Sequence, residues 1–168
     1  MLIEILKRTP TWVFVLFFVL LTLGYFQSKA RTLGRGKVSI LPCVIITLSF
    51  YGVLSAFGTA PVGLISWFVG AASAVWLGLA LAAPKGVVYC DEIRSFSIPG
   101  SWVPLLLMMA IFFTKYAVGV VLARQLPCAL EAKFIGAISL SYGCLGGLFL
   151  ARTLVIWRSA KQNAQNHV

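Results

Sequence analysis

The stretch from Ser101 to Ala123 limits the possible folds more than any other part of the sequence. It is apolar almost throughout, and it is long enough to cross a bilayer, which takes about 20 such residues in a helix. It carries one charge, Lys115, well inside the run. A cation at that depth in a membrane is costly, so Lys115 is the first candidate for a functional residue.

The composition indicates that the rest of the chain is also built for a membrane. Of the 168 residues, 60% are hydrophobic and 11% are charged, and the mean hydropathy is +0.96. A soluble domain carries about 25% charged residues. The length suffices for a single transmembrane domain, residues 1–168. The net charge is +10, but the basic residues stand at the ends of apolar blocks. This placement indicates topology and contact with anionic lipids, and it argues against nucleic-acid binding.

The apolar blocks predict an all-α integral membrane fold, a bundle of five transmembrane helices. We expect the spans at about 11–27, 38–58, 62–83, 101–123 and 134–157, followed by a polar tail at 158–168. A signal peptide cleaved after Ser28-Lys29-Ala30 is the alternative interpretation of the first block. Proline is expected in the first turn of two spans, at Pro42 and at Pro104, where it costs least.

Small residues recur at four-residue spacing in the third and fifth spans. They are Ser66, Gly70, Ala74, Gly78 and Ala82 in the third span, and Ser139, Gly143 and Gly147 in the fifth. Such stripes let helix backbones approach closely, so these two spans should be the tightly packed centre of the bundle. The stripes also offer a surface through which a homo-oligomer could form.

The segment 84–100 is the longest hydrophilic part of the chain. Two short runs of β-type residues in it predict a small hairpin at the membrane surface, with an irregular loop as the alternative. Asp91 and Glu92 lie between the two runs. Adjacent carboxylates on an extended loop point apart, so we interpret them as a solvated turn and not as acid–base or metal-binding groups.

Charge asymmetry orients the bundle. The segment 28–37 holds four cations and no acid, which predicts a cytoplasmic loop. Nine cations then fall on the cytoplasmic side and four outside, so the N-terminus should be out and the C-terminus in. The cations expected to contact lipid headgroups are Lys29, Arg31, Arg35, Lys37 and Arg152.

Patterns for catalysis and metal binding are missing from the sequence. The four cysteines are singletons, and the only histidine is His167 in the polar tail, which argues against a zinc site and against His-ligated haem. Neither a Ser-His-Asp set nor a Gly-rich phosphate loop is present. We therefore expect no metal, no cofactor and no enzymatic activity. Only Cys128 falls in an outer loop, so an intramolecular disulfide is not expected.

Lys115 lies eight residues before Ala123, or about 12 Å from the outer end of its helix. Side chains tilt toward the helix N-terminus, which here points inward, so reaching the outer surface works against the natural direction. Gly119 and Ala123 follow Lys115 at four-residue spacing. This small face should pack on another helix or line a cavity.

Two interpretations of Lys115 stay open. In the functional one, it forms a site between helices for an anionic or protonatable small solute, and the ligand-binding residues are Lys115, Tyr116, Gly119, Ser139 and Tyr142. In the alternative, the amine pairs with Glu131, with helix carbonyls or with outer headgroups, and only fixes the packing. Other polar residues of the second and fifth spans, such as Ser49 and Ser141, either extend a polar lining or bridge helices by hydrogen bonds.

The segments PGSWVPLLLMMAIFFTKYAVGV (99–120) and PTWVFVLFFVLLTLGYFQSKARTL (10–33) resemble a family of small bacterial inner-membrane proteins of unknown function. The resemblance covers most of the chain and is clearest in the Gly-Ser-Trp-x-Pro start and the Thr-Lys-Tyr centre of the fourth span. It implies a multi-pass helical fold in the bacterial cytoplasmic membrane. It implies no activity, so no functional residue can be transferred.

These observations lead to two hypotheses about function. The first is a small inner-membrane protein that binds or passes an anionic or protonatable solute at Lys115, as an oligomer because five helices make a thin wall for a transport path. The second is a non-transporting interaction protein, such as an assembly, accessory or immunity factor, whose lysine is structural. The expected partners are a bilayer with anionic lipids and further copies of the chain, with no nucleic acid.

Overall fold

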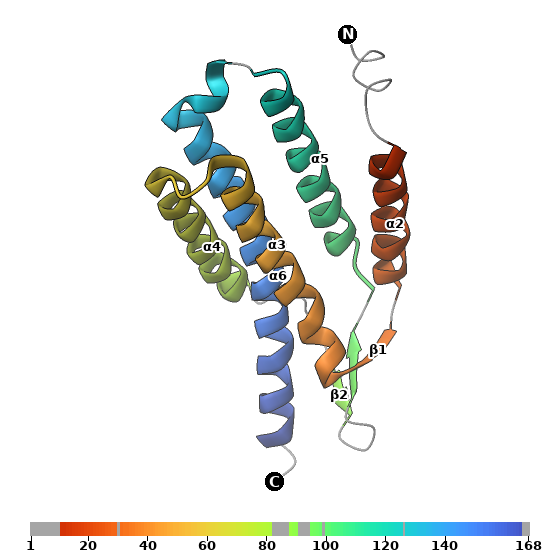
Figure 1. The fold of residues 1–168 in the computed structure, drawn as a ribbon. Helices are drawn as coiled ribbons and strands as arrows, with labels where there is room; N and C mark the ends of the chain where they lie inside the picture. The colour runs from red at the N-terminus through yellow and green to blue at the C-terminus, as the bar shows by residue number, and fades with distance from the viewer. Residues whose placement is uncertain are drawn as a thin grey trace.

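Five α-helices run alongside one another in the part of the chain that the computed structural model describes, residues 11–29, 31–81, 88–90, 95–98, 100–125 and 127–165 (Figure 1). The helices are α2 (Thr11–Ser28), α3 (Arg35–Phe57), α4 (Pro61–Leu81), α5 (Val103–Ala123) and α6 (Ala132–Gln165). Three strands, β1 (Arg31–Gly34), β2 (Val88–Cys90) and β3 (Ser95–Ile98), and a 3-10 turn, η1 (Pro127–Leu130), complete the described elements.

Three of these helices are long and apolar enough to cross a membrane, namely α4, α5 and residues 132–158 of α6. This finding supports the predicted membrane class. The apolar stretches of the other two helices, Val13–Ser28 in α2 and Pro42–Phe57 in α3, are shorter. At 1.5 Å per residue, each of these stretches extends about 24 Å, somewhat less than the hydrocarbon thickness of a typical bilayer.

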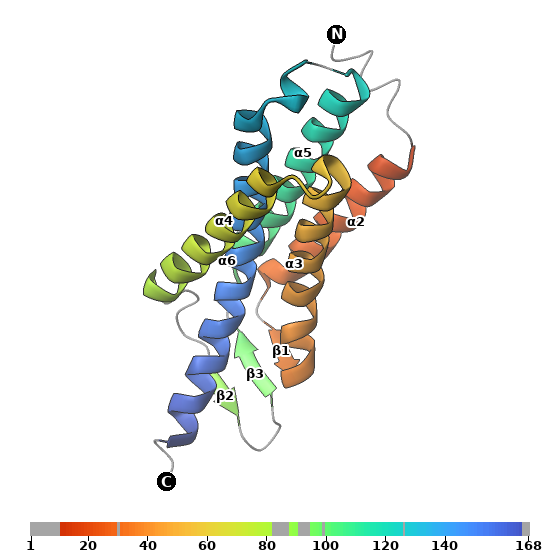
Figure 2. The ribbon, with the colours of Figure 1, turned by 60° about the vertical axis from the view of Figure 1, so that its left-hand side comes forward.

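The helices form two groups (Figure 1), and Figure 2 shows α4 crossing α6. In the first group, α4 packs along α6 and α3 packs on α6 beside it. In the second group, α2 packs on α5, and α5 touches α6 more than it touches α3. One buried cluster, Val53, Trp67 and Tyr142, joins α3, α4 and α6. A second, Leu107, Met108 and Phe149, fixes α5 on α6.

Glycines let the backbones of α4 and α6 touch. A Cβ added at Gly143 would collide with the carbonyl oxygen of Trp67, and one at Gly70 with the carbonyl oxygen of Leu140. A Cβ at Gly147 would lie 2.6 Å from the carbonyl oxygen of Ala71. The predicted close contact between the third and fifth apolar blocks is therefore confirmed. These glycines of the two stripes face each other within one chain, and a homo-oligomer through the stripes stays a prediction.

The strands form a three-stranded antiparallel sheet at the end of the molecule where α6 ends (Figure 1). Strand β3 is central, pairing Val88 of β2 with Ser97 and Arg31 of β1 with Ile98. The pairing of β2 with β3 is the hairpin predicted for 84–100. The third strand, β1, comes from the basic segment that we predicted as a loop, and two-residue periodicity in only four residues is too short to signal a strand.

Two helix boundaries differ from the prediction. Helix α3 begins at Arg35, so Pro42 lies two turns inside it and not in its first turn. Helix α6 continues past Trp157 to Gln165, so residues 158–165 are helical, and α6 contacts β2. Both extensions lie next to the sheet, which the sequence pattern did not reveal. Pro104 does stand in the first turn of α5, as predicted.

Candidate functional site

Lys115 occupies the middle of α5, twelve residues after Val103 and eight before Ala123, or about 12 Å from the end of the helix near η1. The residue is exposed overall, but the end of its side chain crosses to α3. Its Cε and Nζ atoms lie 3.2 and 3.4 Å from the position that a Cβ atom on Gly52 would occupy. The missing side chain of Gly52 therefore makes room for the ammonium group.

Tyr142 of α6 lies at the same glycine. Its Cε2 atom is 3.9 Å from the Gly52 Cβ position, and the residue is 2% exposed. The structure thus brings two of the predicted ligand residues, Lys115 and Tyr142, together around Gly52. We refer to these three residues as the Lys115 site. Gly52 was missed by the sequence analysis because a lone glycine in an apolar block has no periodic neighbour that would reveal a contact with another helix.

The Lys115 ammonium makes no hydrogen bond and no ion pair with any residue that the structure describes. Glu131, which we considered as its partner, belongs to that part of the chain, and so do the carbonyls of α3, α5 and α6. Of the three partners in the packing alternative, neither Glu131 nor a helix carbonyl is engaged. A lysine inside a membrane normally pairs with an opposite charge or with backbone carbonyls. We therefore expect the Lys115 ammonium to bind a partner from outside the described chain.

Tyr116 and Gly119 lie close to Lys115 on α5. The Tyr116 ring is stacked on Phe112, with centroids 6.4 Å apart, and Phe112 in turn meets Phe17 of α2 at 5.4 Å. Gly119 is exposed, and nothing lies within 4 Å of its Cβ position. At Gly119 this small face does not pack on another described helix, which leaves the second alternative, that the face lines a cavity.

Ser139 is also separated from the ammonium group. Its side chain is fully buried, and its Oγ atom lies 3.3 Å from the Cβ position of Gly63 on α4. It is the one buried side-chain polar atom without a hydrogen-bond partner among the described residues. The geometry makes Ser139 part of the crossing between α4 and α6, where a larger residue would not fit.

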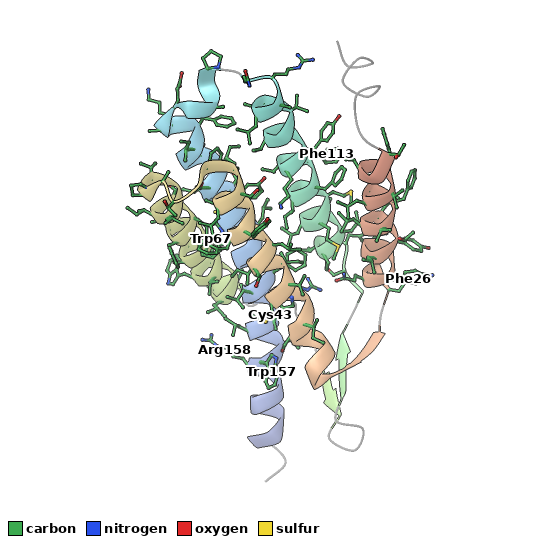
Figure 3. The ribbon with its side chains drawn as sticks, in the orientation of Figure 1. Phe26, Cys43, Trp67, Phe113, Trp157 and Arg158 are labelled. Atoms are coloured by element: carbon green, nitrogen blue, oxygen red, sulfur yellow. The ribbon has the colours of Figure 1, made fainter. Side chains whose placement is uncertain are left out.

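A buried hydrogen-bonded chain also fixes the backbone of Tyr142. The Trp67 indole Nε1 donates to the Ser49 Oγ at 3.0 Å, and that hydroxyl donates to the Tyr142 carbonyl at 2.7 Å. These bonds join α3, α4 and α6, so Ser49 bridges helices and does not line a path. Trp67 lies at the interface of these three helices (Figure 3).

The predicted headgroup contacts can be located only in part. Lys29 is exposed at the end of α2, with its Nζ atom 5.0 Å from the centre of the Tyr25 ring. Arg152 is half-buried in α6 and donates from Nη1 to the Ser101 Oγ at 3.4 Å, so it also ties α6 to the start of α5. The side chains of Arg31, Arg35 and Lys37, and the whole of Asp91 and Glu92, lie outside the described part of the chain.

Comparison with known protein families shows which family the chain belongs to. A model described as "Family of unknown function (DUF6622)" matches residues 1–167. The chain belongs to this family. The resemblance to an uncharacterised membrane family is thereby confirmed, and the apolar helices fit it. The curated proteins and the solved structures contain no match. The family description states no activity, so any function must come from the Lys115 site itself.

Proposed function

We propose that this protein binds an anionic or protonatable small solute at Lys115, as a five-span protein of the bacterial inner membrane. Its N-terminus would lie outside and its C-terminus inside. The role is solute binding or passage, without catalysis. The single observation that carries the proposal is the Lys115 ammonium, which lies mid-helix against Gly52 with no hydrogen bond to the described chain.

The topology is supported by where the cations lie. Lys29, the start of α3 and the C-terminal end of α6 lie at the same end of the molecule as the sheet (Figure 1). Arg124 and Lys133 lie at the opposite end, around η1. The end with the sheet carries the larger number of cations, and cytoplasmic loops are enriched in lysine and arginine.

The energetics support a ligand at the site. A lysine at the centre of a membrane helix costs roughly 2.5–3.5 kcal/mol on insertion scales, and a bound anion or carboxylate offsets part of that cost. The hydrogen-bonded chain through Ser49 and Trp67 fixes the Tyr142 backbone, so one wall of the site is rigid. Such preorganisation lowers the entropy that a ligand must lose on binding.

The experiment is flux through vesicles containing the full-length protein. Proton flux is followed with an internal pH-sensitive dye, and chloride flux with a chloride-sensitive dye. Wild type should exceed empty vesicles, and Lys115→Met should lose at least nine-tenths of that excess. Lys133→Met is the matched control, because it removes the same charge from an exposed position at the start of α6, and it should retain the flux. Equal flux in wild type and Lys115→Met would remove the support for the proposal.

A second candidate is the non-transporting interaction protein. The observation that favours it is the exposed face of α5, where Lys115, Gly119 and Ala123 have space beside them. In that case no flux should be found in wild type. A membrane protein should instead co-purify with wild type and be lost from Lys115→Met.

A further inference from the structure

We infer that the ligand of the Lys115 site is an amphiphilic monoanion, such as a long-chain carboxylate, that enters sideways from the bilayer between α2 and α3. The inference rests on the proposed function and adds the class of ligand and its route. Three features of the described chain carry it: an open side, a closed inner end and an aromatic wall.

The open side is the face of α5 that carries Lys115. Residues four and eight positions later, Gly119 and Ala123, share this face because a helix repeats every 3.6 residues. Both are exposed, and the Cβ position of Gly119 has no atom within 4 Å. A ligand that lies along α5 toward Lys115 therefore finds unfilled space at Gly119.

The inner end is closed by apolar packing. One turn before Lys115, Ile111 packs against the buried cluster of Leu107, Met108 and Phe149. These side chains join α5 to α6, and the buried Gln27 of α2 donates from Nε2 to the Met108 sulfur at 3.9 Å. This end of the site is therefore filled by packed side chains, with Gln27 already bonded to Met108, and such packing favours a ligand that arrives through the lipid phase.

The aromatic wall lies on the α2 side of Lys115. Phe112 and Tyr116 are stacked on each other, and Phe17 of α2 contacts both Phe112 and Phe113. Phe113 is 56% exposed on the side of α5 toward α2 (Figure 3). An alkyl chain or ring lying here gains apolar contacts, and the remaining group next to the ammonium must carry a negative charge.

Charge and depth together favour an amphiphile over a small hydrophilic anion. The site holds one cation and no described carboxylate, which matches one negative charge. Lys115 lies about 12 Å from the end of α5, so a small anion would be separated from bulk water over that whole length. A long-chain carboxylate keeps its tail in hydrocarbon and brings only its head to the ammonium.

The test uses full-length protein in nanodiscs of phosphatidylcholine and oleate labelled with 13C at the carboxyl carbon. Wild type should give a bound carboxyl resonance that empty nanodiscs lack. Lys115→Met and Gly119→Leu should each weaken binding at least tenfold, the first by removing the charge and the second by filling the open space. Lys133→Met and Ala117→Leu are the matched controls, since both positions are exposed and lie away from that face, and they should change binding less than twofold. Oleyl alcohol, which has no charge, should not displace oleate.

The outcomes separate this inference from the proposed function. If acetate binds through Lys115 as tightly as oleate does, the amphiphile is wrong and solute binding stands. Oleate that binds Lys115→Met as well as wild type would overturn the inference. If wild type neither binds oleate or acetate nor shows flux, both proposals fail, and a co-purifying membrane protein would then point to a partner helix. Far-UV circular dichroism of each variant ensures that lost binding is not lost folding.

Discussion

Replacing Gly147 by alanine should loosen the contact between α4 and α6. The new Cβ atom would lie 2.6 Å from the Ala71 carbonyl oxygen, 3.1 Å from the Ala71 Cα and 3.0 Å from the Ala74 Cβ. Ordinary van der Waals contact begins at 3.4 Å, so the shortfall to the oxygen is 3.4 − 2.6 = 0.8 Å. None of these atoms belongs to a flexible side-chain end, so the two helices must move apart.

The magnitude follows from comparing Gly147 with Gly119. Both glycines lie inside helices, so alanine gains the same intrinsic helix propensity at each, up to about 1 kcal/mol. At Gly119 the new methyl group meets nothing within 4 Å, whereas at Gly147 it overpacks the interface. The difference between the two variants isolates the packing term, and overpacking typically costs about 1–3 kcal/mol. Gly147→Ala should therefore be less stable than Gly119→Ala by that amount.

The assay is equilibrium unfolding in mixed micelles, with an increasing fraction of sodium dodecyl sulfate and helix content followed by far-UV circular dichroism. The free energy of unfolding of each variant is compared with that of wild type. If Gly147→Ala and Gly119→Ala agree within about 0.5 kcal/mol, the range usual for surface substitutions, the two helices are not in the close contact described here.

Three further substitutions can be measured in the same assay. Ser49→Ala should cost about 1–3 kcal/mol, because it leaves the buried Trp67 indole without its acceptor, and an unchanged midpoint would contradict that hydrogen bond. Ser139→Ala should leave the free energy of unfolding unchanged or slightly raised, since the buried Ser139 hydroxyl has no described partner. If this variant lost flux in the vesicle experiment, Ser139 would be more than a packing residue. Gln125→Gly should raise the free energy of unfolding by about 1 kcal/mol, because Gln125 has φ of 50° and residues with a Cβ atom lose about that much in this conformation. A lower free energy of unfolding in the variant would contradict this backbone conformation.

Much of the fold follows from local sequence patterns. The positions of the helices, proline in the first turn of α5, and the contact between the glycine stripes of α4 and α6 could all be predicted. Each depends on hydrophobicity or residue size along one helix, and periodicity carries that information. The hairpin of β2 and β3 was predictable for the same reason, since both strands lie in one short hydrophilic segment.

Only part of the candidate site could be predicted from the sequence. Lys115 stands out in the sequence because a charge interrupts an apolar block, and that signal needs no partner. Its neighbour Gly52 lies 63 positions earlier in the chain and is a contact only because α3 and α5 both pack on α6. Likewise β1 is a strand because it pairs with the edge of β3. Ser139 lies against Gly63 and away from the ammonium. Sequence by itself determined which segments form the apolar helices. Which of them meet was decided by tertiary packing, because contacts between helices depend on their relative rotation, and no pattern within a single helix encodes it.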